Sequence, residues 1–295
     1  MSDTPALTSI VSQGLSADID AMGAQLFALR DEQGRDLLWN GDPAFWTGRA
    51  PILFPIVGAL VNDQYRLNGR IYDLPKHGFA RRKRFEVAQA DASSVTMRLK
   101  WDDETLAVYP FRFALDLRFA LEASTLTIIA SVTNLDDQAD MPASFGFHPA
   151  LRWPLPYGRP RFEHRLRFER EEPAPIRRID TNGLVKPDAV ATPVAGRDLV
   201  LRDDLFVNDA VIFDQLNSRA LRYGAPDGPQ LEVAFPDTSL LGVWTKPGAG
   251  YICIEPWHGW ADPEGFAGDI WSKPGIFRVP PGQTRRVSMS ITLRL

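Results

Sequence analysis

Three observations predict an all-β protein built as one large antiparallel β-sandwich. Apolar residues recur with a period of two over long stretches, which is typical of strands that bury one face. No stretch shows the pattern of an amphipathic helix of three or more turns. The 24 prolines and 22 glycines are scattered along the chain, as expected for turns between short strands. In a chain of 295 residues, many short antiparallel strands favour a sandwich over a small barrel.

Four stretches show the alternation most clearly. Residues 94–101 and 111–122 have apolar side chains at every second position, and residues 126–132 and 287–295 repeat the pattern. A further turn signal, Pro-Asp-Gly-Pro at residues 226–229, separates two short strand-like runs. We expect each of these stretches to be a strand with one face in the core.

The stretch of residues 152–202 is the least strand-like, because it is rich in Pro, Arg and Glu. We interpret it as long loops over a cleft, and not as a second domain. The chain shows no internal repeat, no low-complexity linker and no sharp change of composition. Residues 1–295 are therefore predicted to form a single domain, a size that sandwiches reach as one unit.

Composition excludes several classes of protein. A hydrophobic fraction of 44% and a charged fraction of 24% are those of a soluble globular protein. Eight Trp and 17 Phe suit broad sheet interfaces and also sugar sites, where a ring face packs on C–H groups. The net charge of −4 provides no strong positive field for a phosphate backbone, so nucleic acid is not expected as a partner.

Neither a disulfide framework nor a thiolate metal site is expected, because Cys253 is the only cysteine. The N-terminus has no basic stretch followed by an apolar run, and no segment reaches the roughly 18 apolar residues of a membrane span. The sequence predicts a cytoplasmic protein without membrane contact, either a monomer or a homodimer.

Three segments interrupt the strand pattern with ionisable side chains placed beside Gly or Pro and among aromatics. They are residues 74–81, 144–150 and 252–260, and they contain three of the four histidines. Such surroundings suit a site where the backbone bends and water is partly excluded. A buried histidine taken alone is more often a hydrogen-bonded core residue. The fourth histidine, His164, lies in a charged stretch and is expected to be a solvated strand residue.

Glu255 is the strongest single candidate for chemistry. It follows an apolar run, residues 251–254, that indicates a central strand, and it precedes Pro256, which is expected to end regular pairing. Trp257 and Trp260 flank it, so the carboxyl group should be partly desolvated. Desolvation raises the pKa of a carboxyl group and makes it a usable base near neutral pH. The alternative is a glutamate paired with one of the many arginines.

These motifs together resemble the aldose 1-epimerase (galactose mutarotase) superfamily, and most closely its LacX-like branch. The resemblance rests on residues 48–58 and 68–81, on Phe147-His148-Pro149 and on Ile254-Glu255-Pro256-Trp257, in that order, and it extends over about residues 10–295. It implies a β-sandwich of the supersandwich type. It also implies a cofactor-free, metal-independent reaction that interconverts the α and β anomers of a hexose.

The resemblance assigns roles to three residues. Glu255 corresponds to the general base that takes the proton of the anomeric hydroxyl. His148 corresponds to the general acid that protonates the ring oxygen, and His77 to a histidine that hydrogen-bonds the sugar. An acid and a base of these types are well matched near pH 7, and each contributes about 10²–10⁴-fold.

The resemblance also implies substrate-binding residues, which are Arg49, Arg81, Asp209 and Trp257. The segments around residues 54–58 and 78–81 depart from galactose mutarotases and are at least as similar to hexose-6-phosphate mutarotases. Arginines in a cleft suit phosphate because they form bidentate contacts. The expected partner is therefore a small sugar or a sugar phosphate.

Three other functions remain open from the residues alone. His77, His148, His258 and Glu255 could form a metal site, although no short spacing between histidines pre-positions the ligands. A glycosidase or lyase would pair Glu255 with Asp209 or Asp262 across the cleft. A carbohydrate-binding or regulatory protein could keep the same sandwich without turnover. In the basic run of residues 81–84, only Arg81 is expected to face the cleft.

Overall fold

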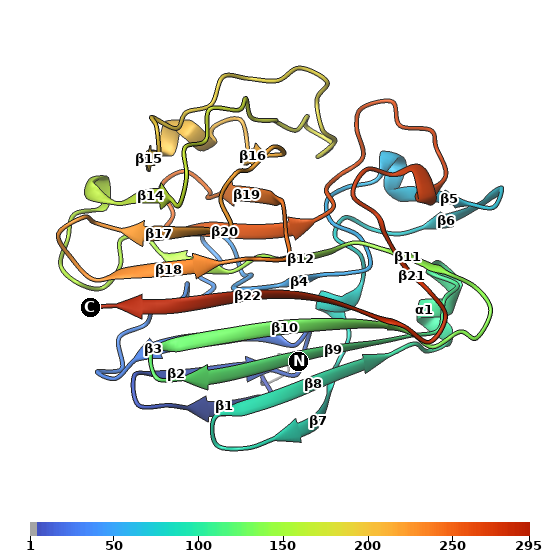
Figure 1. Ribbon diagram of the computed structural model, residues 1–295, viewed down its shortest axis with the longest axis horizontal. Helices are drawn as coiled ribbons and strands as arrows, with labels where there is room; N and C mark the ends of the chain where they lie inside the picture. Colours follow the sequence, from blue (N-terminus) through green and yellow to red (C-terminus); the bar gives the residue numbers. More distant parts are fainter. Residues whose placement is uncertain (1–4) are drawn as a thin grey trace.

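The computed structural model describes residues 5–295, which form five antiparallel sheets (Figure 1). The largest has nine strands, in the order β15 (Asp198–Val200), β14 (Arg165–Phe168), β17 (Ala220–Gly224), β18 (Gln230–Ala234), β22 (Thr284–Arg294), β10 (Thr125–Asn134), β9 (Phe113–Glu122), β8 (Ser94–Lys100) and β7 (Glu86–Ala90). A six-stranded sheet has the order β16 (Val211–Phe213), β19 (Leu240–Trp244), β20 (Tyr251–His258), β12 (Phe145–Phe147) and β4 (Ile52–Leu53), and β13 (Ala150–Arg152) also pairs with β20.

The smaller sheets and the helices complete the architecture. A three-stranded sheet contains β1 (Leu7–Val11), β2 (Leu15–Asp20) and β3 (Gln25–Asp31), and two strand pairs join β5 (Gln64–Leu67) to β6 (Arg70–Asp73) and β11 (Met141–Ala143) to β21 (Phe277–Val279). The helices are α1 (Asp103–Val108) and the 3₁₀ turns η1 (Val61–Asp63), η2 (Ala80–Arg82), η3 (Arg161–Glu163), η4 (Asp203–Phe206) and η5 (Ile270–Ser272). Among residues 5–295, no helix is long and apolar enough to span a membrane.

The two large sheets share one hydrophobic core. Val287 and Ile291 of β22 belong to the same cluster of buried side chains as Ile252 and Ile254 of β20. This packing of sheet on sheet confirms the predicted all-β sandwich. Burial of apolar area at such an interface is the main favourable term in folding.

The predicted period of two is confirmed in the long strands. In β10, buried residues alternate with half-buried ones along its full length, and the strand pairs antiparallel with both β9 and β22. The predicted hairpin around residues 226–229 is also confirmed, because β17 and β18 pair across it. The C-terminal prediction is wrong at its last position. Leu295 lies beyond the final pair, Gln230 with Arg294, and is 83% exposed.

The strand β20 has both faces buried, as expected for a central strand. It also continues through Pro256, which pairs with Leu241, so the expected end of regular pairing at Pro256 is wrong. The reason lies on the other side of β20, where pairing with β12 ends at Trp257 and pairing with β13 begins at Cys253. Pro256 falls between these two stretches, so its absent N–H costs little there.

The stretch of residues 152–202 contains only short strands and irregular chain, as predicted. Isolated bridges fasten it, among them Arg177 to Ile212 and Val185 to Pro263. Figure 1 shows these connections, in green to yellow, beyond the β16–β19 side of the six-stranded sheet. This part of the chain therefore lies where it can border a site on that sheet.

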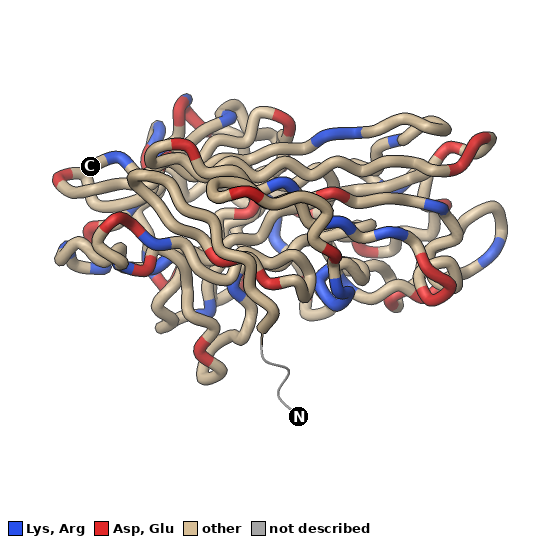
Figure 2. The backbone as a smooth tube through the Cα atoms, turned by 90° about the horizontal axis from the view of Figure 1, so that it is seen from below, with Lys and Arg blue, Asp and Glu red and all other residues tan. Residues whose placement is uncertain are grey.

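Basic and acidic residues are interspersed over the backbone in Figure 2.

Candidate active site

The centre of the site is a direct contact between His148 and Glu255. The pairing of β20 aligns Gly146 with Trp257 and Ala150 with Cys253. The same register, continued through the gap between β12 and β13, places His148 opposite Glu255. Nε2 of His148 lies 3.1 Å from Oε2 of Glu255. The break in the strand thus allows two polar side chains to face each other on a sheet that is otherwise apolar.

His77 reaches the same place from a loop between β6 and η2. Its φ angle is 67°, and that of the following Gly78 is 68°. A Cβ atom at Gly78 would lie 2.3 Å from the carbonyl oxygen of Phe54, so only glycine fits there. Two bonds hold His77 in this left-handed conformation: its N–H donates to the Gly58 carbonyl (2.8 Å), and its Nδ1 accepts from the Gly58 N–H (3.0 Å).

This arrangement fixes the tautomer of neutral His77. Because Nδ1 accepts a hydrogen bond, the ring proton must be on Nε2. The imidazole of His77 lies 6.0 Å from that of His148, centroid to centroid, with the two rings nearly perpendicular at 88°. His77 can therefore serve as a hydrogen-bond donor beside the His148–Glu255 pair.

These three residues border a cavity of about 240 Å³. Its wall combines aromatic, apolar and charged side chains with two glycines and two alanines; its lining residues are Trp46, Gly58, Lys76, His77, Arg81, His148, Ile179, Gly183, Asp209, Ala210, Ile212, Trp244, Glu255, Trp257 and Ala261. Glycine and isoleucine from the stretch of residues 152–202 take part, which supports the prediction that this stretch borders a cleft. One pyranose ring is a suitable occupant for a hollow of this size and polarity.

An aromatic wall surrounds the histidine. The Trp46 ring lies 5.1 Å from His148, and Trp244 lies 6.1 Å from it at a steep angle. Tyr251 is 5.6 Å from each of these two indoles. Trp257 also lines the cavity and lies over Gly242, where a Cβ atom would be 2.5 Å from the indole ring. Flat aromatic faces of this kind pack well on the C–H groups of a sugar.

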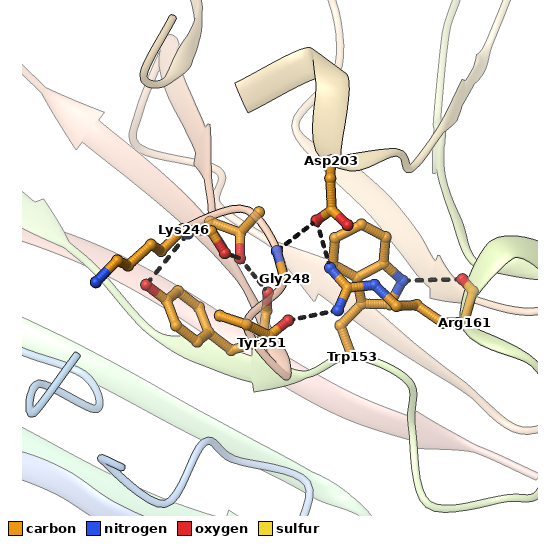
Figure 3. A network of polar contacts seen from close by, with 8 residues as sticks. Trp153, Arg161, Asp203, Lys246, Gly248 and Tyr251 are labelled. Atoms are coloured by element: carbon orange, nitrogen blue, oxygen red, sulfur yellow. Dashed lines mark hydrogen bonds and ion pairs between the residues drawn. The ribbon is translucent and has the colours of Figure 1, made fainter. Parts of the chain in front are cut away.

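A network of hydrogen bonds behind this wall holds the turn that enters β20 (Figure 3). The guanidinium of Arg161 donates to Asp203 (2.6 Å), and the same carboxylate oxygen accepts from the N–H of Gly248 (3.1 Å). The N–H of Lys246 donates to the hydroxyl of Tyr251 (3.3 Å). The turn therefore fixes Tyr251, and with it the position at which the strand carrying Glu255 begins.

Burial disfavours the charged forms of both His148 and Glu255. Desolvation raises the pKa of Glu255 well above 4.5, although the positive charge of Lys76 acts in the opposite direction. Desolvation also lowers the pKa of His148 to about 3, and that of His77 well below 6.5. Nearby positive charges on Lys76 and Arg81 lower both histidine pKa values further. A carboxyl pKa raised in this way is common at catalytic sites.

Several polar atoms of the site have no hydrogen-bond partner. Within residues 5–295, the buried Nδ1 of His148, Nε of Arg81 and Nε1 of Trp257 make no hydrogen bond. Trp257 is close enough to Glu255 to lower the carboxyl pKa, yet its N–H does not reach full hydrogen-bond geometry. Unpartnered buried polar groups are costly, and three of the six in the described part of the chain border this cavity.

Most of the predicted site residues come together in this cavity. Glu255, His148 and His77 lie at its centre, and the predicted binding residues Arg81, Asp209 and Trp257 line it. Asp209 is exposed at the rim with a φ angle of 64°, and its carboxylate accepts from the N–H of Ala210 (2.7 Å).

Arg49 does not lie in the cavity. Its guanidinium covers the ring of Phe27 at 3.7 Å and donates to the Phe27 carbonyl (2.9 Å). Its backbone N–H donates to the side chain of Gln25. Arg49 thus joins its own loop to β3, and the structure gives no support to its predicted role in binding substrate.

Residues that the sequence did not single out complete the site. Trp46, Trp244 and Lys76 line the cavity. The two tryptophans lie outside the motifs, whereas Lys76 directly precedes His77. Lys76 was next to a predicted residue, so its position in the loop was a usable signal. The two tryptophans lie just outside the motif segments, and no local pattern separates them from core aromatics.

The two other histidines lie outside the cavity. His164 is 1% exposed, so its prediction as a solvated residue is wrong: Nε2 accepts from the N–H of Leu155, and Nδ1 contacts the Pro160 carbonyl. His258 packs edge-on against Phe277 outside the cavity, which removes it from the predicted metal set.

Asp262 forms an ion pair with Lys273 (2.7 Å) and does not line the cavity. It is therefore unsuitable as the second carboxylate of a glycosidase. In the basic run after Arg81, Arg82 and Arg84 are exposed, as predicted, whereas Lys83 is half-buried and bonds to Asp102 and Glu104.

Comparison with known proteins identifies the family. The model of the aldose 1-epimerase family matches residues 6–278. The chain belongs to this family. It is 32% identical over 288 residues to the chromosomal LacX protein of Lactococcus lactis subsp. lactis, an alignment that covers 95% of this chain and 96% of LacX.

Solved structures agree with this assignment. A galactose mutarotase related enzyme from Lactobacillus acidophilus has a TM-score of 0.89 and 29% identity, and the alignment covers 98% of this chain and 97% of that one. A galactose mutarotase-like protein from Lactobacillus casei has the same TM-score and 28% identity over 98% of this chain and 100% of its own. The galactose mutarotase-like fold expected from the sequence is thus confirmed.

Proposed function

We propose that this member of the aldose 1-epimerase family is a hexose 1-epimerase that interconverts α and β anomers by acid–base ring opening. The observation that carries the proposal is the 3.1 Å contact between His148 and Glu255 on the wall of a cavity suited to one sugar ring. Binding alone requires neither a buried glutamate with a raised pKa nor a histidine beside it, whereas ring opening requires both a base and an acid.

The proposed reaction needs a single proton, shared between Glu255 and His148. Its transfer from Glu255 to His148 produces a carboxylate and an imidazolium without a proton from solvent. The carboxylate then removes the proton of the hydroxyl at C1, the bond from C1 to the ring oxygen breaks, and His148 protonates that oxygen. The products are an open-chain aldehyde, a protonated Glu255 and a neutral His148.

Ring closure reverses these steps on the other face of the aldehyde. After rotation about the C1–C2 bond, His148 takes the proton of the attacking hydroxyl and Glu255 protonates the aldehyde oxygen. The Nε2–H of neutral His77 is available to donate to the sugar and to stabilise charge that develops on oxygen. Trp46, Trp244 and Trp257 provide the faces on which the ring is held.

The proposal is tested by anomer exchange, measured by saturation-exchange NMR on a panel of hexoses and hexose 6-phosphates. We expect the wild type to accelerate exchange of at least one sugar. His148→Ala should reduce that rate by about 10²–10⁴-fold, the usual contribution of a positioned acid. His258→Ala, a histidine outside the cavity, is the matched control and should keep the rate. A wild type that binds a sugar without accelerating exchange would make the chain a carbohydrate-binding protein.

The cavity also favours a phosphorylated hexose as the substrate. Lys76 and Arg81 both line it, and within residues 5–295 neither forms an ion pair with a carboxylate. The guanidinium of Arg81 donates to the Lys76 carbonyl (2.8 Å), which leaves most of its donors available. Two cations without acidic partners suit a phosphate group.

A comparison of rates with a hexose 6-phosphate and with the corresponding neutral hexose tests this choice of substrate. Lys76→Gln should lower kcat/KM for a hexose 6-phosphate by roughly 10- to 100-fold, because a hydrogen bond to a charged group contributes about 1.5–3 kcal/mol. The rate with the neutral hexose should change little. Arg82→Gln, an exposed neighbour that does not line the cavity, is the control. Equal losses for both substrates would remove the phosphate from the proposal.

A further inference from the structure

Cys253 places a thiol, a common metal ligand, beside His148 and Glu255. Cys253 and Glu255 are two residues apart on β20, so their side chains project from the same face of the sheet. His148 is opposite Glu255. The Sγ of Cys253, a ring nitrogen of His148 and a carboxylate oxygen of Glu255 all lie within 4.8 Å of one another, and all three residues are buried.

These separations are close to those of a zinc site. With bonds of about 2.0–2.3 Å to nitrogen, oxygen and sulfur, the ligand atoms of a tetrahedral site are roughly 3.3–3.7 Å apart. The contact between His148 and Glu255 already measures 3.1 Å. Side-chain movements of about 1 Å would therefore bring the three atoms into tetrahedral positions. The fourth position would face the cavity that His148 and Glu255 line, where water can enter.

The charges and donor types also match a soft divalent cation. A thiolate and a carboxylate together balance two positive charges, so the filled site would be neutral, and a neutral site is the form that a buried position tolerates. Thiolate and imidazole select zinc over magnesium or calcium. The ligand nitrogen would be Nε2 of His148, which already faces Oε2 of Glu255 at 3.1 Å.

We propose that His148, Cys253 and Glu255 form a binding site for Zn²⁺, and that Zn²⁺ bound there inhibits the enzyme. The inhibition, although not the binding, rests on the proposed epimerase function. A bound ion would occupy the lone pairs that the acid and the base need, so neither could exchange a proton with the sugar. The expectation from the sequence that one cysteine excludes a thiolate metal site would then be wrong, because His148 and Glu255 supply the remaining ligands.

Cobalt provides a direct test of the binding site. Titration of the purified chain with Co²⁺ should give one ion per chain and a sulfur-to-cobalt charge-transfer band in the near ultraviolet. Cys253→Ala should abolish the band and weaken binding by about 10- to 100-fold or more, since even the loss of a supporting partner has an effect of that size. Cys253→Ser is a second variant that keeps the side-chain size, so that a folding defect in one does not decide the result.

Zinc addition then tests the inhibition. Zn²⁺ should suppress anomer exchange by the wild type, and a chelator should restore it, whereas Cys253→Ala should need at least about tenfold more Zn²⁺. His258→Gln, which alters a histidine outside the cavity, should respond as the wild type does. If the chain has no epimerase activity, the cobalt titration alone decides the site. Absence of stoichiometric binding, or equal metal affinity in the wild type and Cys253→Ala, would overturn the proposal.

Discussion

Two hollows of the molecule contain a buried pair of ionisable side chains, and they differ in how the pair is bonded. The larger, of about 320 Å³, is bordered by Lys273 and Asp262, which form an ion pair at 2.7 Å. The second carboxylate oxygen of Asp262 accepts from the N–H of Val61 (3.0 Å). In the smaller cavity, of about 240 Å³, His148 and Glu255 meet at 3.1 Å while Nδ1 of His148 has no partner.

Unsatisfied polar groups, and not the volume of the hollow, distinguish the proposed reaction site from the hollow beside Lys273 and Asp262. Lys273 and Asp262 are each nearly fully buried and tie η5 to η1, a structural task that uses both carboxylate oxygens. His148 and Glu255 join no such separate elements; they oppose each other across a break in one sheet. Their bonding capacity is left over for a ligand, at a cost in stability that other parts of the fold offset.

In catalysis, a change in the His148–Glu255 pair should matter far more than a change in the Lys273–Asp262 pair. Glu255→Gln removes the base but keeps the shape of the side chain, so anomer exchange should fall by about 10²–10⁴-fold. Lys273→Met should retain the wild-type rate per folded molecule, because Lys273 is outside the cavity. Saturation-exchange NMR, normalised to the folded fraction, measures both. A similar loss in the two variants would mean that the fold, and not the base, sets the rate.

For stability, the larger effect should come from the Lys273–Asp262 pair. Lys273→Met leaves the buried carboxylate of Asp262 without its counter-charge, so the free energy of unfolding should fall by about 3–5 kcal/mol. Urea denaturation followed by tryptophan fluorescence measures the change. A value within about 1 kcal/mol of the wild type would place the Lys273–Asp262 pair among exposed ion pairs and remove its structural role.

A smaller loss is expected from His164, which provides a histidine of the structural kind. Its Nε2 accepts from the N–H of Leu155 at 3.0 Å, and its Nδ1 contacts the Pro160 carbonyl at 3.0 Å. His164→Ala would leave two buried backbone groups unpaired and should cost about 1–3 kcal/mol of unfolding free energy without affecting the rate. Loss of anomer exchange in a folded His164→Ala would contradict the division between the two kinds of histidine.

The last prediction is a small gain in stability on replacing Glu255, and this gain depends on pH. Burial raises the pKa of Glu255 above 4.5, so the folded chain holds a proton that the unfolded chain releases once the pH exceeds 4.5. The stability that Glu255 contributes is complete below pH 4.5 and is lost as the pH rises toward its folded pKa.

Glu255→Gln cannot ionise, so it should be more stable than the wild type by about 0.5–2 kcal/mol near neutral pH. The gain should disappear as the pH falls to 4.5, the unperturbed value of the group. Thermal unfolding over this pH range measures it. A gain that is the same at all pH values would assign the effect to packing and not to the buried charge.

Much of the fold follows from local pattern. The long strands β8, β9, β10 and β22 were predicted because each buries one face against the same core, and such strands must alternate. The short strands β4 and β12, of two and three residues, carry too few positions to show any period. Helix α1 is six residues long, and its capping box of Asp102 and Thr105 is its clearest local signal.

The site was predicted through its motifs, and the errors arise where tertiary contacts decide. Arg49 lies within a recognised segment, yet its guanidinium stacks on Phe27 of a different strand. His164 lies in a charged stretch of sequence and was expected to be exposed, but contacts with two backbone groups offset the cost of burying it. Trp46 and Trp244 enter the cavity through packing of distant segments, and the opposition of His148 to Glu255 depends on a register that only the folded sheet displays.

Glu255, His148 and His77 are proposed to act on one sugar ring, and a crystal structure of Glu255→Gln with a bound hexose or hexose 6-phosphate would reveal whether they do. We predict that the hydroxyl at C1 lies within hydrogen-bond distance of the Gln side chain at position 255. The ring oxygen should lie toward the imidazoles of His148 and His77. A sugar bound in this cavity with C1 directed away from both His148 and residue 255, or bound only elsewhere on the molecule, would contradict the proposed mechanism.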